Sequence, residues 1–378
     1  MRILWTNHFD QRGSGYLSLS IPICSALQEA GHEVKVLGLE YRGEEVSYPF
    51  SVIPAATFQD VMFQADGLRN LWKPDVFIAA FDLPVQQIFL DSPVFKDLPY
   101  IGIFPIESDP LCLPYAMLIS RMTVPCVISK FGIAECDKFG IPAKYFEIAL
   151  DPEIWRVPSE DERNHAREAF GLTDQFTVLT VADNQERKNL SRSMEIFSAF
   201  HAKYPNSRYV LVTREKLSVG WELRDLARVL GIGDVFQLYE RGMDVHDLWT
   251  LYAAADVFLL TSKAEGAGIP ILEAMAIGLP VIGTDCTAIH EHLEGGRGFL
   301  IPWEFDYIDP FMNGRRYFAS REKGIEILTE VYQLWLDDDN VELDDVRIKA
   351  FKYVENRKRE NSVSMIMEAL NDCKKSTS

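Results

Sequence analysis

Residues 256–302 contain a strand, a glycine-bearing loop, a helix and a second strand in close succession. The segment reads DVFLLTSKAEGAGIPILEAMAIGLPVIGTDCTAIHEHLEGGRGFLIP. The apolar run at residues 257–260 is typical of a buried strand, and a second strand follows an apolar helix at residues 280–284. Strands that are joined through a helix in this way belong to parallel sheets. This segment therefore predicts an α/β fold.

The same alternation of strands and helices extends over the whole chain. We predict strands at residues 2–5, 32–37, 75–80, 100–104, 124–129, 177–182, 209–213, 235–238, 257–260 and 280–284. The helices predicted between them cover residues 16–30, 57–72, 130–139, 190–201 and 221–230. This pattern indicates parallel sheets with helices packed on both faces.

The length of 378 residues is sufficient for two domains. A Pro- and acid-rich stretch at residues 151–162 marks the junction between them. We expect two doubly wound domains, at residues 1–155 and 156–361. In such sheets ligands bind at the carboxyl ends of the strands, so the two domains are expected to face each other across a shared crevice.

Composition restricts the partners and the compartment. A net charge of −18 argues against a polyanion bound over a broad surface and against anionic lipid. The sequence has no uncharged apolar run of about 18 residues, so we predict no transmembrane segment, and the first strand begins without a secretory signal. Six scattered cysteines with no C-x-x-C pair favour free thiols in a reducing compartment, and hence a cytoplasmic protein.

The loop before the apolar helix that starts at Pro270 has the character of an anion site. Pro270 suits the first position of a helix, where its missing N–H has no consequence. The free N–H groups and the positive dipole end of the helix would then lie on the loop. Glu265 in the loop and Glu273 in the first helical turn flank this place, and carboxylates beside a phosphate are explained if they bind sugar hydroxyls. A sugar nucleotide fits this arrangement. The alternative is a plain corner, with Glu265 solvated and Glu273 favoured by the dipole.

The E-x7-E pattern within EGAGIPILEAMAIGLPVIGTD closely resembles the signature of glycosyltransferase family 4, the group 1 glycosyl transferases. The resemblance implies the GT-B fold, with two facing Rossmann-like domains and a C-terminal helix, about residues 362–378, that packs back on the first domain. It also implies that a sugar is transferred from a nucleotide-diphosphate donor to an acceptor hydroxyl with retention of configuration. Glu265 would then hold the donor sugar and Glu273 the ribose. The backbone N–H groups that would face the diphosphate belong to Gly266, Ala267, Gly268 and Ile269.

A second element of the predicted site follows the first strand of the second half, in VLTVADNQERKNL. Arg187 and Lys188 stand where two cations would neutralise the growing charge of a diphosphate leaving group. A basic pair on a surface loop is the simpler alternative. The position resembles the diphosphate-binding element of the family, except that Asp183 occupies the place where its members commonly carry Arg.

Near the N-terminus, TNHFDQRGSGYLSLS places Gly13 and Gly15 between a strand and a helix. Glycines allow a backbone to approach a ligand closely, and the resemblance assigns this loop to the donor–acceptor cleft. A dinucleotide fingerprint is the competing interpretation, although Ser18 stands where a third glycine is required. In the same loop His8, Asp10 and Arg12 are either acceptor contacts or ordinary polar residues. The family's later histidine is missing, and Glu107, Asp109 or His8 are candidates to replace it.

We predict no metal site and no cofactor. His290 and His292 are two residues apart rather than four, and no third ligand is evident. Glu291 resembles a structural or helix-capping acid of the family.

The partners expected are a nucleotide-sugar donor and an unidentified acceptor hydroxyl on a glycan, a lipid-linked glycan, a protein or a small molecule; the acidity disfavours a modified nucleic acid. The turn at residues 239–243 is a positional candidate for the base. The alternatives are a non-catalytic or accessory nucleotide-sugar-binding protein, a GT-B phosphorylase, synthase or epimerase and, more remotely, a dehydrogenase.

Overall fold

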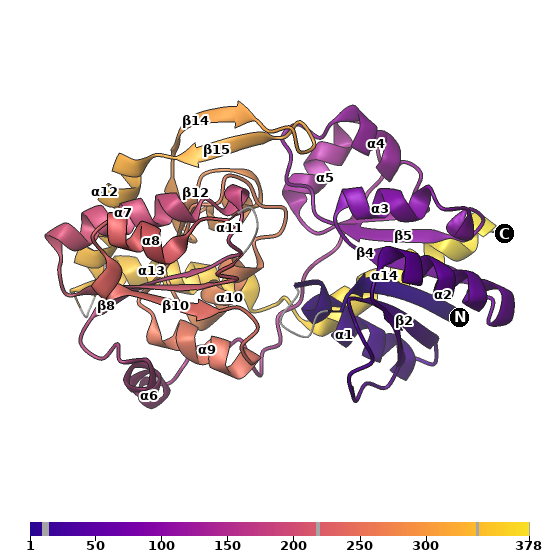
Figure 1. Cartoon of the computed structure of the whole chain (residues 1–378), viewed down its shortest axis with the longest axis horizontal. Helices are drawn as coiled ribbons and strands as arrows, with labels where there is room; N and C mark the ends of the chain where they lie inside the picture. Colours follow the sequence, from indigo (N-terminus) through magenta and orange to yellow (C-terminus); the bar gives the residue numbers. More distant parts are fainter. Residues whose placement is uncertain (10–14, 217–219, 338–339, 378) are drawn as a thin grey trace. The chain divides into compact units, whose positions relative to one another are not determined.

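The computed structural model describes residues 1–9, 15–216, 220–337 and 340–377. Residue contacts divide the chain into two compact units, Met1–Ala149 with Arg357–Ser378, and Leu150–Asn356. Each unit is built on its own parallel sheet (Figure 1). None of the helices in the described part of the chain combines the length and the apolar character that a membrane-spanning helix requires.

The first unit has a seven-stranded sheet in the order β3-β2-β1-β4-β5-β6-β7. Its strands are β1 (Arg2–His8), β2 (Glu33–Leu39), β3 (Ser51–Ala55), β4 (Val76–Ala80), β5 (Tyr100–Phe104), β6 (Val124–Val127) and β7 (Lys144–Tyr145). Its helices are α1 (Gly15–Glu29), α2 (Phe58–Leu71), α3 (Leu83–Leu90), α4 (Leu113–Ile119), α5 (Lys130–Asp137) and α14 (Arg359–Thr377). All neighbouring strands run parallel, and β4 and β5 are completely buried because helices cover both faces of the sheet.

Two differences from the sequence prediction have local causes. The strand predicted at residues 124–129 ends at Val127, because the Ser129 side chain accepts a hydrogen bond from the Gly132 N–H and caps α5. The strand β3 was not predicted, since it contains Pro54. Proline lacks the N–H that a central strand needs but is tolerated at an edge, and β3 is an edge strand of the sheet.

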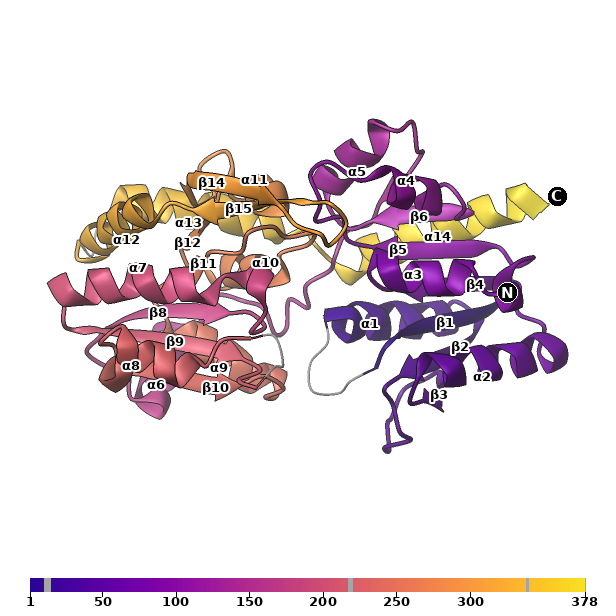
Figure 2. The same ribbon diagram turned by 45° about the horizontal axis from the view of Figure 1, so that its top comes forward.

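The C-terminal helix α14 belongs to the first unit, although more than 200 residues separate it from the rest of that unit. The Ser362 hydroxyl donates to the Glu147 carbonyl at 2.7 Å, and Lys144 pairs with Asp372 at 2.5 Å. Figure 2 shows α14 lying along the sheet beside β6.

The second unit has a six-stranded parallel sheet in the order β10-β9-β8-β11-β12-β13. Its strands are β8 (Phe176–Val181), β9 (Ser207–Thr213), β10 (Phe236–Glu240), β11 (Val257–Leu260), β12 (Val281–Thr284) and β13 (Phe299–Ile301). Its helices are α6 (Glu160–Phe170), α7 (Leu190–Lys203), α8 (Leu223–Val229), α9 (Val245–Ala254), α10 (Ile269–Ile277), α11 (Thr287–Leu293), α12 (Arg321–Trp335) and α13 (Val341–Val354). The strand order reverses between β8 and β11, and ligands of open α/β sheets bind at such a switch point.

A separate antiparallel hairpin, β14 (Trp303–Ile308) and β15 (Arg315–Ala319), was not predicted from the sequence. It lies at the top of the second unit in Figure 1. The Tyr317 N–H donates to the Lys263 carbonyl at 2.9 Å, so the hairpin is attached to the loop that follows β11.

Candidate active site

The loop after β11 is held from one side by α11. The Glu265 N–H donates to the Thr287 hydroxyl at 2.9 Å, and the Glu265 carbonyl accepts from the Ala288 N–H at 3.2 Å. The helix α10 then begins at Ile269. Pro270 is therefore its second residue, whereas the sequence predicted that it would be the first. Gly268 caps the helix with a φ of +64°, a left-handed conformation that glycine adopts without strain.

Several backbone N–H groups of this loop are available to a ligand. In the described part of the chain, Gly266, Gly268 and Ile269 donate no hydrogen bond from their N–H groups. Gly266 and Gly268 are nevertheless buried. Because an unsatisfied N–H is costly when it is buried, and because the positive end of the α10 dipole lies here, the loop is suited to an anion.

Lys188 and Arg187 approach this loop from β8, on the other side of the switch point. They lie in a short 3-10 helix, Glu186–Lys188, and the Arg187 carbonyl accepts from the Lys263 N–H at 2.8 Å. The Lys188 ammonium donates to Glu265 Oε1 at 2.6 Å, and Arg187 donates to Glu265 Oε2 at 3.1 Å. The fold thus brings together the three residues that the sequence analysis proposed for catalysis.

The electrostatics of this cluster keep Glu265 ionised. Burial raises the pKa of Glu265, but the charges of Lys188 and Arg187 outweigh this effect and hold the pKa at about 2. Two cations contact one carboxylate here, in a protein whose net charge is −18. The cluster is therefore electrostatically favourable for an anion.

Glu273 is the fifth residue of α10 and so lies beyond the first turn, where the sequence analysis placed it. The Tyr252 hydroxyl donates to Glu273 Oε2 at 2.9 Å. Burial raises the pKa of Glu273 to about 7, against the opposing effects of this hydrogen bond and of the Arg241 charge. Glu273 consequently changes its charge near neutral pH.

A second charged cluster, which the sequence analysis did not identify, surrounds Asp183. Arg214 donates to its two oxygens at 3.1 and 2.8 Å, and Arg241 donates at 2.5 Å. Burial opposes ionisation of Asp183, but its pKa is lowered by the hydrogen bond from Arg214 and the charge of Arg241. Asp183 thus orders two arginines, Arg214 and Arg241. Each follows a strand directly, Arg214 after β9 and Arg241 after β10, which is the signal that could have identified them.

Lys263 connects the loop that follows β11 with the loop that follows β8. Its ammonium pairs with Glu186 and lies 4.0 Å from the centre of the Phe318 ring on β15. Burial lowers the pKa of Lys263 to about 8; Asp309 opposes this shift, and Arg316 adds to it. Lys263 lies within the segment 256–302 that the sequence analysis singled out, but its contacts with Glu186 and Phe318 are visible only in the fold.

The first-unit candidates are only partly described. Gly13, Asp10 and Arg12 lie outside the described residues, whereas Gly15 is the first residue of α1. His8 ends β1, and its Nδ1 is 3.6 Å from a carboxylate oxygen of Glu40. The roles predicted for this loop remain predictions.

The histidines of α11 have different surroundings. His290 Nδ1 lies 2.6 Å from Asp285, whereas the buried His292 places Nε2 2.7 Å from the Ala267 carbonyl. Within the described residues, no group of three or more His, Cys, Asp and Glu side chains is arranged to hold a metal ion.

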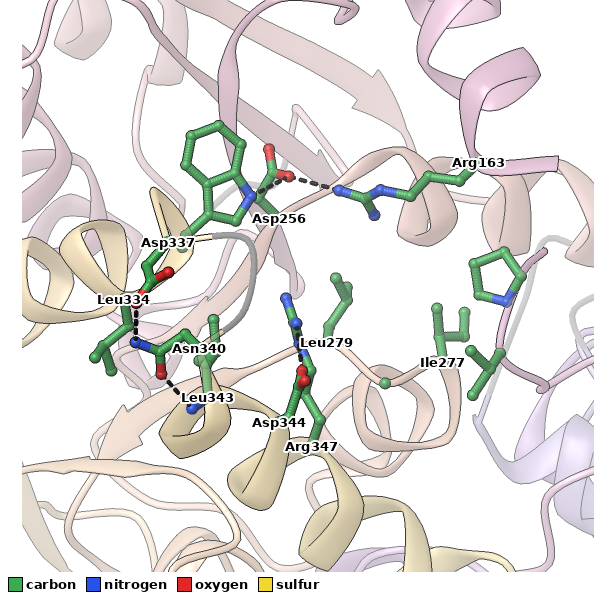
Figure 3. A pocket seen from close by; sticks show the side chains of 14 residues that line it. Arg163, Asp256, Ile277, Leu279, Leu334, Asp337, Asn340, Leu343, Asp344 and Arg347 are labelled. Carbon is green, nitrogen blue, oxygen red and sulfur yellow. Dashed lines mark hydrogen bonds and ion pairs between the residues drawn. The ribbon is translucent and has the colours of Figure 1, made fainter. Parts of the chain in front are cut away.

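A cavity of about 330 Å³ lies at the opposite, amino end of the sheet (Figure 3). Asp256, which directly precedes β11, points into it and is fully buried. It accepts hydrogen bonds from Arg163 at 2.5 Å, from Arg167 at 3.0 Å, from the Thr177 N–H at 2.8 Å and from Trp335 at 3.0 Å. These contacts join α6, β8 and α12 to the base of the sheet, and we interpret the cluster as structural.

Comparisons with known proteins agree with this architecture. The family described as glycosyl transferases group 1 matches residues 162–306. The chain is 30% identical to EpsD of Bacillus subtilis over 164 residues, which are 43% of this chain and 42% of EpsD. It is 27% identical to mannosylfructose-phosphate synthase of Agrobacterium fabrum over 199 residues, 48% of this chain and 43% of the synthase. The chain therefore spans less than half the length of these curated relatives.

Solved structures match over nearly the whole chain. Anabaena Alr3699/HepE in complex with UDP-glucose aligns with a TM-score of 0.74 and 16% identity over 98% of this chain and 99% of that one. Sucrose-phosphate synthase from Thermosynechococcus elongatus aligns with a TM-score of 0.75 and 15% identity over 100% of both chains. At these identities the likeness shows the fold, which is GT-B.

The two doubly wound sheets and the loops at the switch point of the second define a GT-B protein. More specifically, residues 162–306, which lie in the second unit, match the group 1 glycosyl transferases.

Proposed function

We propose that this protein is a glycosyltransferase that moves a sugar from a nucleotide-diphosphate donor to an acceptor hydroxyl with retention of anomeric configuration. The observation that carries the proposal is the cluster of Glu265, Lys188 and Arg187 at the switch point, beside the N–H groups that begin α10. It combines two cationic side chains with backbone donors, which is the environment that a diphosphate requires.

In this mechanism the cluster stabilises the leaving group. Negative charge grows on the diphosphate oxygen as the glycosidic bond breaks. Lys188 and Arg187 already have fixed positions because each contacts a different oxygen of Glu265, so little reorganisation is needed when the charge develops. The N–H groups of Gly266, Ala267, Gly268 and Ile269 add the field of the helix end.

The two acidic residues would bind hydroxyl groups of the donor. A carboxylate can accept about four hydrogen bonds, so Glu265 keeps capacity for a sugar hydroxyl while it holds both cations. Glu273, eight residues further along, would accept from the ribose hydroxyls. Its ionised form is the stronger acceptor, and the Tyr252 hydroxyl orients it by donating to Oε2.

The acceptor hydroxyl would attack from the face that the diphosphate leaves, and a phosphate oxygen would take its proton. This route requires no protein nucleophile, metal ion or cofactor. The glycine loop at Gly13 and Gly15 would belong to the acceptor side. A cytoplasmic location is part of the proposal and is supported by the cysteines, none of which forms a disulfide bond.

A direct test is to incubate the full chain with a panel of nucleotide-diphosphate sugars, with and without candidate glycan, lipid-linked and small-molecule acceptors. We expect one donor to give a glycosylated product whose anomeric configuration, read from NMR coupling constants, is that of the donor. An inverted product would contradict the retaining mechanism.

Two alternative functions predict different results. Sugar phosphate formed from an added glycan and inorganic phosphate would indicate a phosphorylase, and an isomerised donor formed without an acceptor would indicate an epimerase. Donor binding without turnover over the whole acceptor panel would indicate an accessory protein and would contradict the proposed activity.

A further inference from the structure

His292 is not among the proposed donor-binding residues, but it contacts the loop that precedes α10. It lies on α11, is only 2% exposed, and places Nε2 2.7 Å from the Ala267 carbonyl oxygen. A carbonyl oxygen accepts hydrogen bonds but cannot donate, so Nε2 must carry the proton. The other ring nitrogen, Nδ1, lies 3.2 Å from the Tyr353 hydroxyl of α13 and can accept from it. Both nitrogens of a neutral imidazole are thereby satisfied.

This hydrogen bond determines the direction of a neighbouring N–H group. In a trans peptide the carbonyl of one residue and the N–H of the next point in opposite directions. Because the Ala267 carbonyl points toward His292 on α11, the Gly268 N–H points away from α11. In the described part of the chain this N–H donates no hydrogen bond, although Gly268 is buried.

The surroundings hold His292 in place. The Arg297 guanidinium lies 4.4 Å from the centre of the Tyr353 ring and donates to the His292 carbonyl at 2.8 Å. Gly268 is also in close contact, since a Cβ atom added to it would lie 3.4 Å from His292 Cδ2. The imidazole therefore packs directly beneath the left-handed residue that begins α10.

We infer that His292 is a positioning residue for the donor diphosphate: by holding the Ala267 carbonyl, it directs the Gly268 N–H toward a phosphate oxygen. The inference rests on the proposed function, because it assumes that the diphosphate occupies this loop. Tyr353 supports the positioning from behind through Nδ1. This assignment gives His292 a role that does not involve a metal ion.

Two substitutions distinguish the role of Nε2 from the role of Nδ1. In His292→Gln the side-chain amide nitrogen can take the place of Nε2 and donate to Ala267. In His292→Asn the amide reaches only the place of Nδ1. We expect His292→Asn to weaken binding of a nucleoside diphosphate about tenfold, while His292→Gln stays within about threefold of the wild type. Titration calorimetry on the full chain would measure the affinity of both variants for the nucleoside diphosphate. The affinity of His292→Asn for the nucleoside monophosphate should fall by a smaller factor.

The ¹H–¹⁵N resonance of Gly268 supplies a readout that a purely structural role would not change. A phosphate oxygen that accepts from this N–H should shift its proton resonance downfield in the wild type and in His292→Gln, but not in His292→Asn. Equal affinities and equal shifts in the two variants would overturn the inference.

The failure of the proposed function would have a different signature. If the wild type bound no nucleoside diphosphate, or if Lys188→Ala bound it as tightly as the wild type, the donor site itself would be wrong. If Lys188→Ala lost affinity and His292→Asn did not, only the positioning role would fail. Should His292→Asn not fold, Tyr353→Phe tests the same contact chain, with an expected loss of about threefold.

Discussion

The two ends of the second sheet each carry a buried carboxylate that contacts two cationic side chains, but the ends differ in what surrounds the charges. At the amino end, Asp256 is fully buried and accepts from four groups that belong to helices and strands of the core. At the carboxyl end, Lys188 and Arg187 contact Glu265, and the adjoining loop has N–H groups without partners in the described residues. A charged cluster whose hydrogen bonds are all made within the core stabilises the fold, whereas a cluster beside unpartnered N–H groups can bind a ligand.

The strongest test of this comparison is to neutralise the amino-end carboxylate. Asp256→Asn keeps the shape but leaves Arg163 and Arg167 without their counter-charge. Since removing one partner of a buried ion pair is strongly destabilising, we expect a loss of about 3–5 kcal/mol in the free energy of unfolding, measured by urea denaturation. The folded fraction should bind donor with unchanged affinity; a large loss of affinity would mean that the two ends are not independent.

The reverse pattern is expected at the carboxyl end. Lys188→Ala should lower the rate of sugar transfer by about 10²–10³-fold, because a preorganised donor to the leaving group is lost. The midpoint of urea unfolding should change far less than in Asp256→Asn. Lys323→Ala, which removes an exposed lysine paired with Glu326 on α12, is the matched control and should leave both quantities unchanged. Near-native transfer by Lys188→Ala would remove the leaving-group assignment.

A smaller effect is expected from Glu273→Gln. The amide retains the size of the carboxylate but not its charge, so binding of the donor should weaken by about 1–3 kcal/mol, the contribution of a hydrogen bond to a charged group. Calorimetric titration would measure the affinity, and steady-state assays would measure turnover. A loss of turnover with unchanged donor affinity would contradict the ribose role.

The smallest effect concerns pH. With a pKa of about 7, Glu273 is mostly protonated at pH 6 and mostly ionised at pH 8. If the ionised form binds the ribose, donor affinity should rise by up to about tenfold over this interval, in proportion to the competent fraction. Glu273→Gln should show a flatter profile, and a wild-type profile without this dependence would show that ionisation of Glu273 is not used.

Protein stability should show the opposite trend. The pKa of Glu273 is raised in the folded state above its ordinary value of 4.5. Between these two values the folded state binds more protons than the unfolded state, so the slope of unfolding free energy against pH is negative. The contribution of this carboxyl is therefore fully present below about pH 4.5 and is lost as the pH rises through about 7. Urea titrations of the wild type and Glu273→Gln at several pH values would measure the difference.

Much of the fold was predictable because strands in parallel sheets are apolar throughout. The predicted strand at residues 257–260 is identical to β11, and the strand predicted at 100–104 is identical to β5. The hairpin β14–β15 escaped prediction because its exposed side chains, such as Trp303 and Phe305, give no continuous buried run. Short helices such as α4 have too few turns to show a clear period.

The candidate site was predictable where its residues are close in the chain and follow strands directly. Glu265, Gly266 and Gly268 share one loop, and Lys188 follows β8. The side chains that hydrogen-bond to the acidic residues of the site, and so shift their pKa values, were not predictable. Tyr252 is 21 residues from Glu273, and Arg241 is 58 residues from Asp183. His292 was considered only as a metal ligand, because its contact with Ala267 depends on how α11 packs.

By itself, the sequence determined the alternation of strands and helices and the loops that carry charge, because hydrophobic periodicity and glycine placement are local properties. The tertiary structure decided which charges meet. It gave Glu265 two cations, and it gave Glu273 a buried environment that raises its pKa to about 7. Burial and Coulomb interactions depend on distances between residues that are far apart in the chain, and only the packing of the sheet fixes those distances.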